Sequence, residues 1–174
     1  MAMFVHIAPA RLEKTIRRVG LRPGRALFPG AHDSAGIYAF PVLPSHTLTH
    51  QWTREVLKWR REPLIGVRLR VPDAQIVRYA RYNEVWTEAR ASAAIADIAA
   101  RPDPRGWEVL LDAPVPASAI MAIYPLRGVV GWRHRPDAHE RAPCGCPACV
   151  MRGEPGGRRL RAAYAARDRA DGLD

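Results

Sequence analysis

The sequence predicts an α+β domain built on a mixed or antiparallel sheet, followed by a C-terminal extension rich in Cys and His. Segments with strand periodicity and segments with helix periodicity are interspersed, which excludes an all-α or all-β fold. Several late strands follow one another without an intervening helix, which argues against a doubly wound parallel sheet. Beyond Gly131 the composition shifts to His, Cys, Pro and Gly, and then to Arg and Ala. We therefore expect a main domain at residues 1–132 and an extension at 133–174.

The first third of the chain is expected to alternate strands with helices. Phe4 to Ile7 indicates a short strand, and Pro9 opens a helix whose apolar residues recur three or four positions apart until Gly20 ends it. A loop then leads to a strand from Gly36 to Val42. From Ser45 to Trp59 the apolar spacing indicates an amphipathic helix.

The rest of the main domain is expected to hold most of the sheet. Leu64 to Val71 alternates apolar with Gly or Arg residues, the pattern of a strand with one buried face. The elements expected after it are a strand from Gln75 to Tyr79, an alanine-rich helix from Glu84 to Ala100, a strand from Trp107 to Leu111, and a strand from Ile120 to Trp132 interrupted at Pro125.

Composition favours a cytoplasmic protein with a real core. The chain has 174 residues, of which 48% are hydrophobic, near the usual size of one domain. No apolar run approaches the roughly 20 residues that span a bilayer, so we expect no membrane partner. The N-terminus lacks the basic start and cleavage site of a secretory signal.

The strong positive charge is compatible with a nucleic-acid partner. Lys and Arg number 27 against 17 Asp and Glu, giving a formal net charge of +10. A basic surface attracts phosphates and gains by releasing their counterions. Only Lys14 and Lys58 are lysines, however, so the excess is almost entirely arginine and also fits a biased overall composition.

Three segments carry a resemblance to a known family. They are Val5-His6-Ile7 with the helix that follows, Gly36-Ile37-Tyr38-Ala39-Phe40, and Glu108-Val109-Leu110-Leu111 with the proline-bounded turn after it. In this order and spacing they resemble the histidine-tyrosine-glutamate branch of the ADP-ribosyltransferase superfamily. That branch includes diphtheria-type toxins, poly-ADP-ribose polymerases and DNA-modifying toxins of toxin-antitoxin pairs. The resemblance covers about residues 4–125 and implies the split sheet of that family.

The resemblance implies an NAD-dependent transferase that releases nicotinamide and passes ADP-ribose to an acceptor. His6 is then expected to bond a ribose hydroxyl of NAD, Tyr38 to stack on the nicotinamide ring, and Glu108 to bond the nicotinamide ribose. A carboxylate suits this place because positive charge builds on the ribose as its bond to nicotinamide breaks. The acceptor stays open between protein, nucleic acid, a small molecule and water, because acceptor loops vary independently of the NAD site.

Two residues compete with this assignment. The family often has a second aromatic residue on the helix after the tyrosine strand, and Trp52 is the nearest candidate. Trp52 also belongs to an apolar stripe, so we assign it to the core. Glu84 follows a predicted strand and rivals Glu108 as the catalytic carboxylate. We prefer Glu108 because Glu84 is expected to begin a helix, where an acid complements the dipole.

A second cluster near the C-terminus predicts a structural zinc site. It has the spacing His-x4-His-x4-Cys-x-Cys-x2-Cys and comprises His134, His139, Cys144, Cys146 and Cys149. Three thiolates and one imidazole complete a tetrahedral zinc shell. We expect His139 to be the fourth ligand because it is nearer, with His134 as the alternative. A closed site of this kind is structural, since catalysis needs an open coordination position.

Two other functions remain open from the sequence. One is a non-enzymatic module that binds nucleic acid or protein and has a zinc-stabilised tail. It accounts for the charge and the cysteines but leaves the joint pattern at His6, Tyr38 and Glu108 to chance. The other is an NAD-dependent RNA 2′-phosphotransferase on a similar fold, which needs arginines grouped around a phosphate.

Overall fold

A computed structural model describes residues 1–24, 35–59, 62–82, 84–126 and 157–170. The chain divides into two compact units, Met1–Trp132 and Arg133–Asp174, and each is described by itself. Helix α5 (Gly157–Ala170) is the element described in the second unit. None of the helices in the described ranges is both long enough and apolar enough to cross a membrane.

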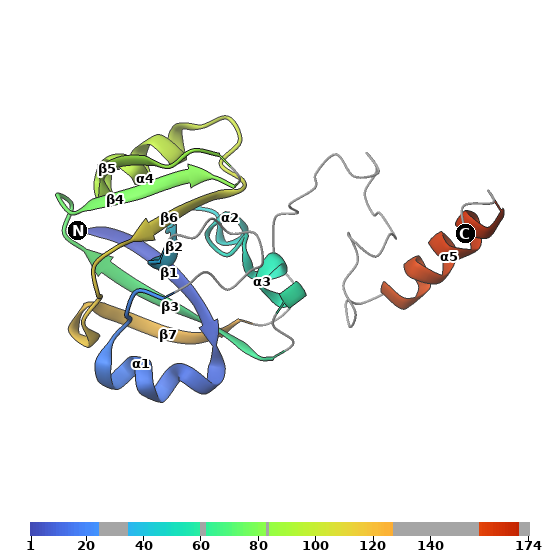
Figure 1. The fold of residues 1–174 in the computed structure, drawn as a ribbon, viewed down its shortest axis with the longest axis horizontal. Coiled ribbons are helices and arrows are strands. Elements are labelled where there is room, and N and C mark those ends of the chain that lie inside the picture. The colour runs from blue at the N-terminus through green and yellow to red at the C-terminus, as the bar shows by residue number, and fades with distance from the viewer. Residues whose placement is uncertain (25–34, 60–61, 83, 127–156, 171–174) are drawn as a thin grey trace. The chain divides into compact units, whose positions relative to one another are not determined.

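The first unit is an α+β fold with a seven-stranded sheet (Figure 1). All the described strand pairs are antiparallel, in the order β5-β4-β6-β2-β1-β3-β7. The strands are β1 (Ala2–Pro9), β2 (Ile37–Pro41), β3 (Leu64–Val71), β4 (Ile76–Arg81), β5 (Thr87–Arg90), β6 (Trp107–Leu111) and β7 (Ile120–Leu126). The helices are η1 (Ala10–Leu12), α1 (Glu13–Val19), α2 (His46–Thr49), α3 (Thr53–Trp59), α4 (Ala91–Ala100) and η2 (Ala117–Ala119).

The sheet consists of two halves that meet over a very short stretch. One half is β7-β3-β1 and the other is β2-β6-β4-β5. Among the described residues, β1 and β2 pair only at Phe4 with Pro41 and at Val5 with Phe40. Beyond Val5, β1 stays with β3 as far as Pro9, whereas β2 stays with β6. The two halves therefore diverge from His6 onward.

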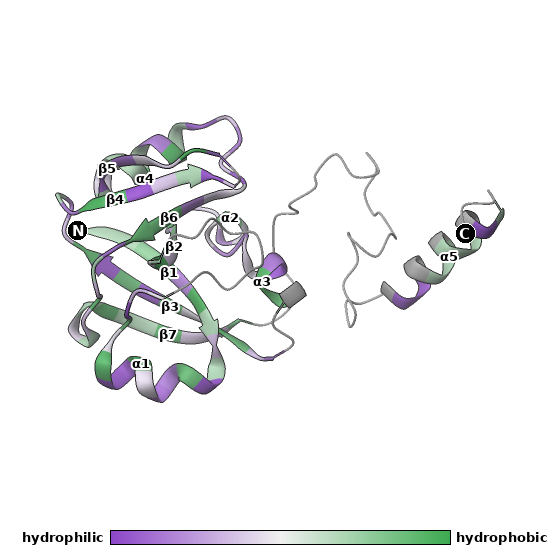
Figure 2. Ribbon diagram, in the orientation of Figure 1, coloured by the Kyte–Doolittle hydropathy of each residue, from purple (hydrophilic) through white to green (hydrophobic). Residues whose placement is uncertain are grey.

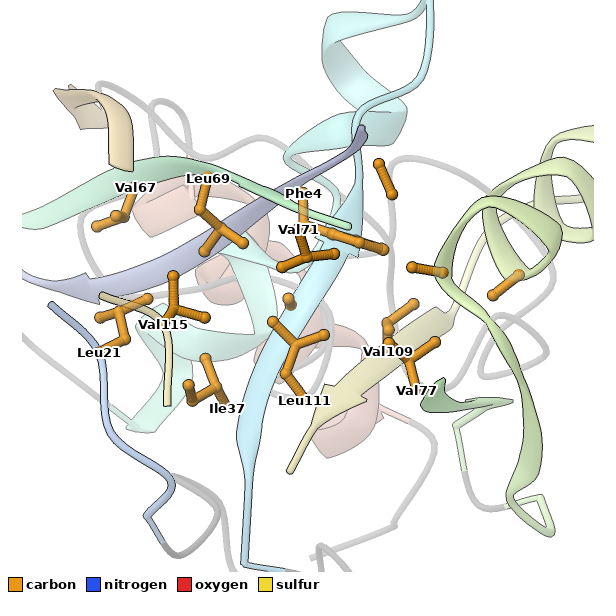
Figure 3. Close-up of a cluster of buried hydrophobic side chains, with 14 of the residues drawn as sticks. Phe4, Leu21, Ile37, Val67, Leu69, Val71, Val77, Val109, Leu111 and Val115 are labelled. Carbon is orange, nitrogen blue, oxygen red and sulfur yellow. The ribbon is translucent and has the colours of Figure 1, made fainter. Parts of the chain in front are cut away.

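Apolar side chains cover both faces of the sheet. The larger cluster packs strand residues from both halves against Ile16 of α1 and Ile98 of α4. Figure 3 shows this cluster, in which side chains of β1, β2, β3, β4 and β6 meet. The smaller cluster lies on the opposite face and packs Trp52 and Val56 against Phe40. Trp52 is 1% exposed, which confirms its assignment to the core. The hydropathy colouring of Figure 2 shows hydrophobic and hydrophilic residues interspersed along the strands and helices of this unit.

The segment from Ser45 to Trp59 forms two short helices instead of the one expected. The residues between them, His50, Gln51 and Trp52, which we call the bridging segment, are held by tertiary hydrogen bonds instead of a continuous helical ladder. His50 Nε2 lies 2.7 Å from the Tyr124 hydroxyl of β7.

On the other side, the bridging segment is tied to the start of β6. The Gln51 amide donates to the Pro104 carbonyl at 3.2 Å and accepts from the Gly106 N–H at 2.7 Å. Trp52 Nε1 donates to the Trp107 carbonyl at 2.9 Å. One end of the segment is therefore bonded to β7, in the first half of the sheet, and the other to the second half.

The predicted helix from Glu84 to Ala100 is correct only from Ala91 onward. Residues 87–90 form strand β5, which pairs with β4 from Ile76 to Tyr79. Glu84 lies in the turn between the two strands, so the expectation that it begins a helix is wrong. Pairing with the otherwise open edge of β4 outweighs the local helix propensity of this segment.

The predicted interruption at Pro125 is also wrong, because β7 continues through it. Pro125 pairs with Ile65 of β3 in regular register. Strand β7 is at the edge of the described sheet, so one of its sides needs no partner. Proline lacks an N–H, and an edge position tolerates this loss.

Gly20, at the C-terminal end of α1, is expected to be intolerant of any side chain. Its φ is +78°, and an added Cβ would lie 2.1 Å from the Val115 carbonyl oxygen. Gly20→Ala should lower the free energy of unfolding by on the order of 3 kcal/mol, measured by chemical denaturation. Gly24→Ala is the matched control, because nothing lies within 4 Å of an added Cβ there. Equal stability losses in the two variants would contradict this explanation.

Candidate active site

His6 lies where the two halves of the sheet separate. Its Nδ1 is 2.7 Å from the backbone oxygen of Tyr38. A carbonyl only accepts hydrogen bonds, so Nδ1 carries the proton and Nε2 is left as an acceptor. Burial lowers the pKa of His6, and the bond to Tyr38 opposes this only in part. The imidazole is therefore neutral at neutral pH, with Nε2 able to accept from a hydroxyl group.

A cavity of about 370 Å³ opens at this point of divergence. Its described lining includes His6, Ile7, Tyr38 and Phe40 from the strands, and Leu12, Thr15, Ile16, Val19 and Arg22 from η1, α1 and the turn that follows. Among these lining residues, Arg22 is the only permanently charged one. The cavity is thus an apolar cleft with one cation at its α1 side and polar groups from β1 and β2.

Glu108 is a buried carboxylate on β6, next to β2. Its side chain is 6% exposed, and the register of β2 with β6 puts it opposite Phe40, on the same face as Tyr38. Burial raises the pKa of Glu108 to about 8. No described residue donates a hydrogen bond to this carboxylate, so nothing in this part of the chain offsets its desolvation. A buried carboxylate held in this way is typical of a functional site.

Tyr38 lies between His6 and Glu108. The pKa of its phenol is raised to about 12, first by burial and then by the charge of Glu108. Its hydroxyl is buried and has no hydrogen-bond partner in the described structure. The backbone oxygen of Tyr38 therefore accepts a hydrogen bond from His6, while its side chain lies near Glu108.

Two further aromatic residues lie close to Tyr38 or Glu108, and the sequence did not indicate either of them. The ring of Trp86 meets that of Tyr38 edge-on, at a centroid distance of 6.3 Å and an angle of 65°. The pKa of Tyr82 is raised by burial, and then by Glu108 and Glu55. Both residues are far from Tyr38 and Glu108 in sequence, and only the pairing of β4 with β5 and β6 brings them here.

The predicted trio thus converges on one region, though not on one face. His6 lies opposite Val67 in the β1–β3 register, which puts its Cβ on the face of the larger core cluster. Tyr38 and Glu108 point to the other face. The imidazole bonds to Tyr38 because the strands separate beside it. Glu84, the rival carboxylate, is exposed in the β4–β5 turn.

The predicted zinc site takes all its ligands from the C-terminal extension. His134, His139, Cys144, Cys146 and Cys149 all lie outside the described residues, so the zinc site stays a prediction from the sequence. Within the described ranges, no group of three or more His, Cys, Asp or Glu side chains is arranged to hold a metal ion.

Replacing Glu108 by glutamine should stabilise the protein at alkaline pH. In the folded state its pKa of about 8 exceeds the ordinary value of 4.5. The carboxyl therefore does not lower the free energy of unfolding below about pH 4.5. It lowers that free energy progressively as the pH rises from 4.5 to about 8. At about 1.4 kcal/mol per pKa unit, Glu108→Gln should raise the free energy of unfolding by on the order of 5 kcal/mol at pH 9. Urea denaturation at pH 5 and pH 9 measures this, and a gain that does not grow with pH would contradict it.

Comparisons with protein-family models, with curated proteins and with solved structures return no match for this chain.

Proposed function

We propose that the chain is an NAD-dependent ADP-ribosyltransferase that breaks the bond between nicotinamide and ribose. The observation that carries the proposal is the buried carboxylate of Glu108, which accepts no hydrogen bond from the described residues and lies near Tyr38, a residue that lines the cavity where the antiparallel sheet divides. A sheet that separates next to a histidine of its first strand also fits the split-sheet fold of that superfamily.

In this proposal His6 and Tyr38 bind the dinucleotide. The free Nε2 of His6 accepts a hydrogen bond from a ribose hydroxyl, and its fixed tautomer favours a donor group there. The ring of Tyr38 supplies a flat surface for nicotinamide. Arg22, which lines the cavity, attracts the diphosphate.

Glu108 acts on the bond that breaks. As nicotinamide leaves with the electron pair of the C–N bond, positive charge builds on the ribose. A carboxylate fixed beside that ring stabilises the transition state more than the ground state. The apolar surroundings strengthen this effect because little water screens the two charges.

The cavity favours this activity over RNA 2′-phosphotransfer. A phosphate-directed enzyme needs several arginines around one pocket. Arg22 stands alone among the described lining residues. A binding module without catalysis, in turn, has no use for a carboxylate whose burial costs stability.

Incubation of the full chain with NAD, followed by chromatography for free nicotinamide, tests the proposal. A thermal shift with NAD gives a separate measure of binding, because a ligand of the folded state raises the unfolding midpoint. Nicotinamide release with NAD-induced stabilisation is the expected result. Absence of both, with DNA, RNA or protein added as acceptors, would rule out the assignment.

A further inference from the structure

The hydrogen bond between His50 and Tyr124 lies on the face of the sheet that carries the smaller core cluster. Tyr124 of β7 pairs with Gly66 of β3, and Gly66 pairs with Ile7 of β1, a member of that cluster. The ring of Tyr124 packs closely on the backbone of β3, because a Cβ added to Gly66 would lie 2.7 Å from it. Tyr124 is therefore held in one position beside His50, and the two rings meet edge-on at a centroid distance of 5.6 Å.

The hydrogen bonds of the His50 ring fix which of its nitrogens carries the proton. Nδ1 lies 2.9 Å from the backbone oxygen of His46. A carbonyl only accepts, so Nδ1 is the donor and Nε2 of the neutral ring has only a lone pair to offer. The Tyr124 hydroxyl, 2.7 Å from Nε2, is therefore the donor in this bond. The bond as it stands requires a neutral His50.

The charges that act on His50 are all positive. The ring of His46 lies at a centroid distance of 4.2 Å, and Arg68 of β3 hydrogen-bonds the same phenol oxygen that His50 contacts. The part of β1 on this face is apolar. Arg54 and Glu55 of α3 are buried as well, and neither is among the charges that shift the pKa of His50. Among the described residues, no carboxylate therefore favours an imidazolium at this place.

Protonation of His50 is consequently opposed while the bond is intact. Burial lowers the pKa of His50, the bond to the His46 carbonyl raises it, and the charges of His46 and Arg68 lower it again. An imidazolium would also have to donate from Nε2 to the oxygen that Arg68 already bonds, and the phenolic hydrogen would need a new acceptor. If the segment opens, His50 enters water, where its pKa returns to the ordinary value of 6.5. Acid therefore favours the open form.

We propose that the hydrogen bond between His50 and Tyr124 is a pH-sensitive link between the two halves of the sheet, closed at neutral pH and released when His50 takes up a proton. Above about pH 6.5 neither form is protonated, and the link has its full stability. As the pH falls below 6.5, the open form binds a proton that the closed form does not, so opening becomes up to about tenfold more frequent per pH unit. The link works in this way whatever reaction the cleft carries out.

Release is expected on one side of the bridging segment only. Gln51 bonds the Pro104 carbonyl and the Gly106 N–H, and Trp52 bonds the Trp107 carbonyl. None of these groups titrates in this pH range. The bridging segment therefore stays with the second half of the sheet, and the contact with β7 is the one that is lost.

NMR of the full chain between pH 8 and pH 5 tests the link. Ring-nitrogen shifts distinguish the two neutral tautomers of His50 from its imidazolium. Amide exchange at pH 7.5 and pH 5.5, corrected for the intrinsic effect of pH, measures local opening. The amide of His50, bonded to the His46 carbonyl, reports on the β7 side, and that of Gly106, bonded to Gln51, reports on the β6 side. Urea denaturation at both pH values gives the global stability.

Three variants accompany the wild type. His50→Gln keeps polar groups at this position but does not titrate. Tyr124→Phe keeps the ring against Gly66 and removes only the hydroxyl. Tyr79→Phe is the matched control, because the Tyr79 hydroxyl bonds Asp97 of α4 and its ring packs against the larger core cluster.

In the wild type, His50 should carry its proton on Nδ1 at pH 7.5 and titrate below 6.5. Its amide should exchange up to about tenfold faster at pH 5.5, while that of Gly106 changes little. Tyr124→Phe should raise the exchange of His50 about fivefold already at pH 7.5, the loss of one hydrogen bond, and move the ring pKa toward its ordinary value. His50→Gln should show no pH response at position 50, and Tyr79→Phe should resemble the wild type.

Three outcomes would overturn the link. One is a wild-type His50 that carries its proton on Nε2 or titrates at or above 6.5. Another is a pH response of exchange that persists in His50→Gln, which assigns the titration to another group, such as His6. The third is an opening free energy at His50 that equals the free energy of global unfolding at both pH values, because the segment then opens only when the whole domain unfolds.

Discussion

Glu108→Gln is expected to lower the rate of nicotinamide release by about a thousandfold while weakening NAD binding at pH 7 much less, by about tenfold. With a pKa of about 8, Glu108 in the empty cleft is mostly protonated at pH 7. An amide resembles that neutral form in size and hydrogen bonding, so most of the binding energy is preserved. Only an ionised carboxylate, however, balances the charge that builds on the ribose. Steady-state kinetics with nicotinamide detection, together with calorimetric NAD titration, separate the two effects.

Glu84→Gln is the control for this variant. Glu84 is the other carboxylate that the sequence offers near a strand end, and it is exposed in the β4–β5 turn. Its amide variant should keep wild-type rates. A large rate loss in Glu84→Gln with normal rates in Glu108→Gln would transfer the catalytic role to the turn.

NAD should bind about ten to a hundred times more tightly at pH 9 than at pH 6. The oxidised nicotinamide ring is a cation, and an opposite charge close to a carboxyl lowers its pKa by about 1 to 3 units. Binding and ionisation of Glu108 are therefore linked, and affinity rises as the pH approaches the empty-cleft pKa of about 8. Tyr38 and Tyr82 also face Glu108, but their pKa values are raised above the ordinary 10.0, so they stay neutral over most of this range. Calorimetric titration at each pH measures the slope.

Two comparisons isolate the cause of this pH dependence. The reduced dinucleotide has a neutral nicotinamide ring and should bind with little dependence on pH. Glu108→Gln should also remove the slope for the oxidised form. A slope that persists in Glu108→Gln would assign the titration to another group, such as His6.

The parts of the fold that the sequence predicts well are those whose signal is local. Residues 67–71 of β3 alternate buried and exposed because one face is covered there, and this pattern can be recognised from the local sequence alone. Residues 64–67 are all buried, which the alternation of apolar residues does not indicate. Residues 87–90 gave the opposite outcome. Their alanine-rich context favours a helix, and only the free edge of β4 draws them into a strand. The predicted interruption at Pro125 is wrong for a related reason. Whether a strand lies at the edge of a sheet depends on the whole sheet and not on the local sequence.

The candidate site likewise contains residues that the local sequence indicates and residues that it does not. His6, Tyr38 and Glu108 were selected by the order of three short segments, each at a strand that the sequence indicates. Trp86 carries no such signal, because its contact with Tyr38 joins residues that are far apart in the sequence. The separation of β1 from β2, which lets His6 reach Tyr38, is likewise invisible in the sequence of either strand.

The bridging segment has a mechanical consequence for the cleft. Among the described residues, the two halves of the sheet share only two ladder pairs, and the bridging segment joins them at a second place. His50 is hydrogen-bonded to Tyr124 in the first half, and Gln51 and Trp52 are hydrogen-bonded at the start of β6 in the second half. These hydrogen bonds, which lie away from His6, therefore fix the angle at which the two halves of the sheet separate beside it. Tyr124, which does not line the cavity, thereby influences how widely the two halves of the sheet separate at His6.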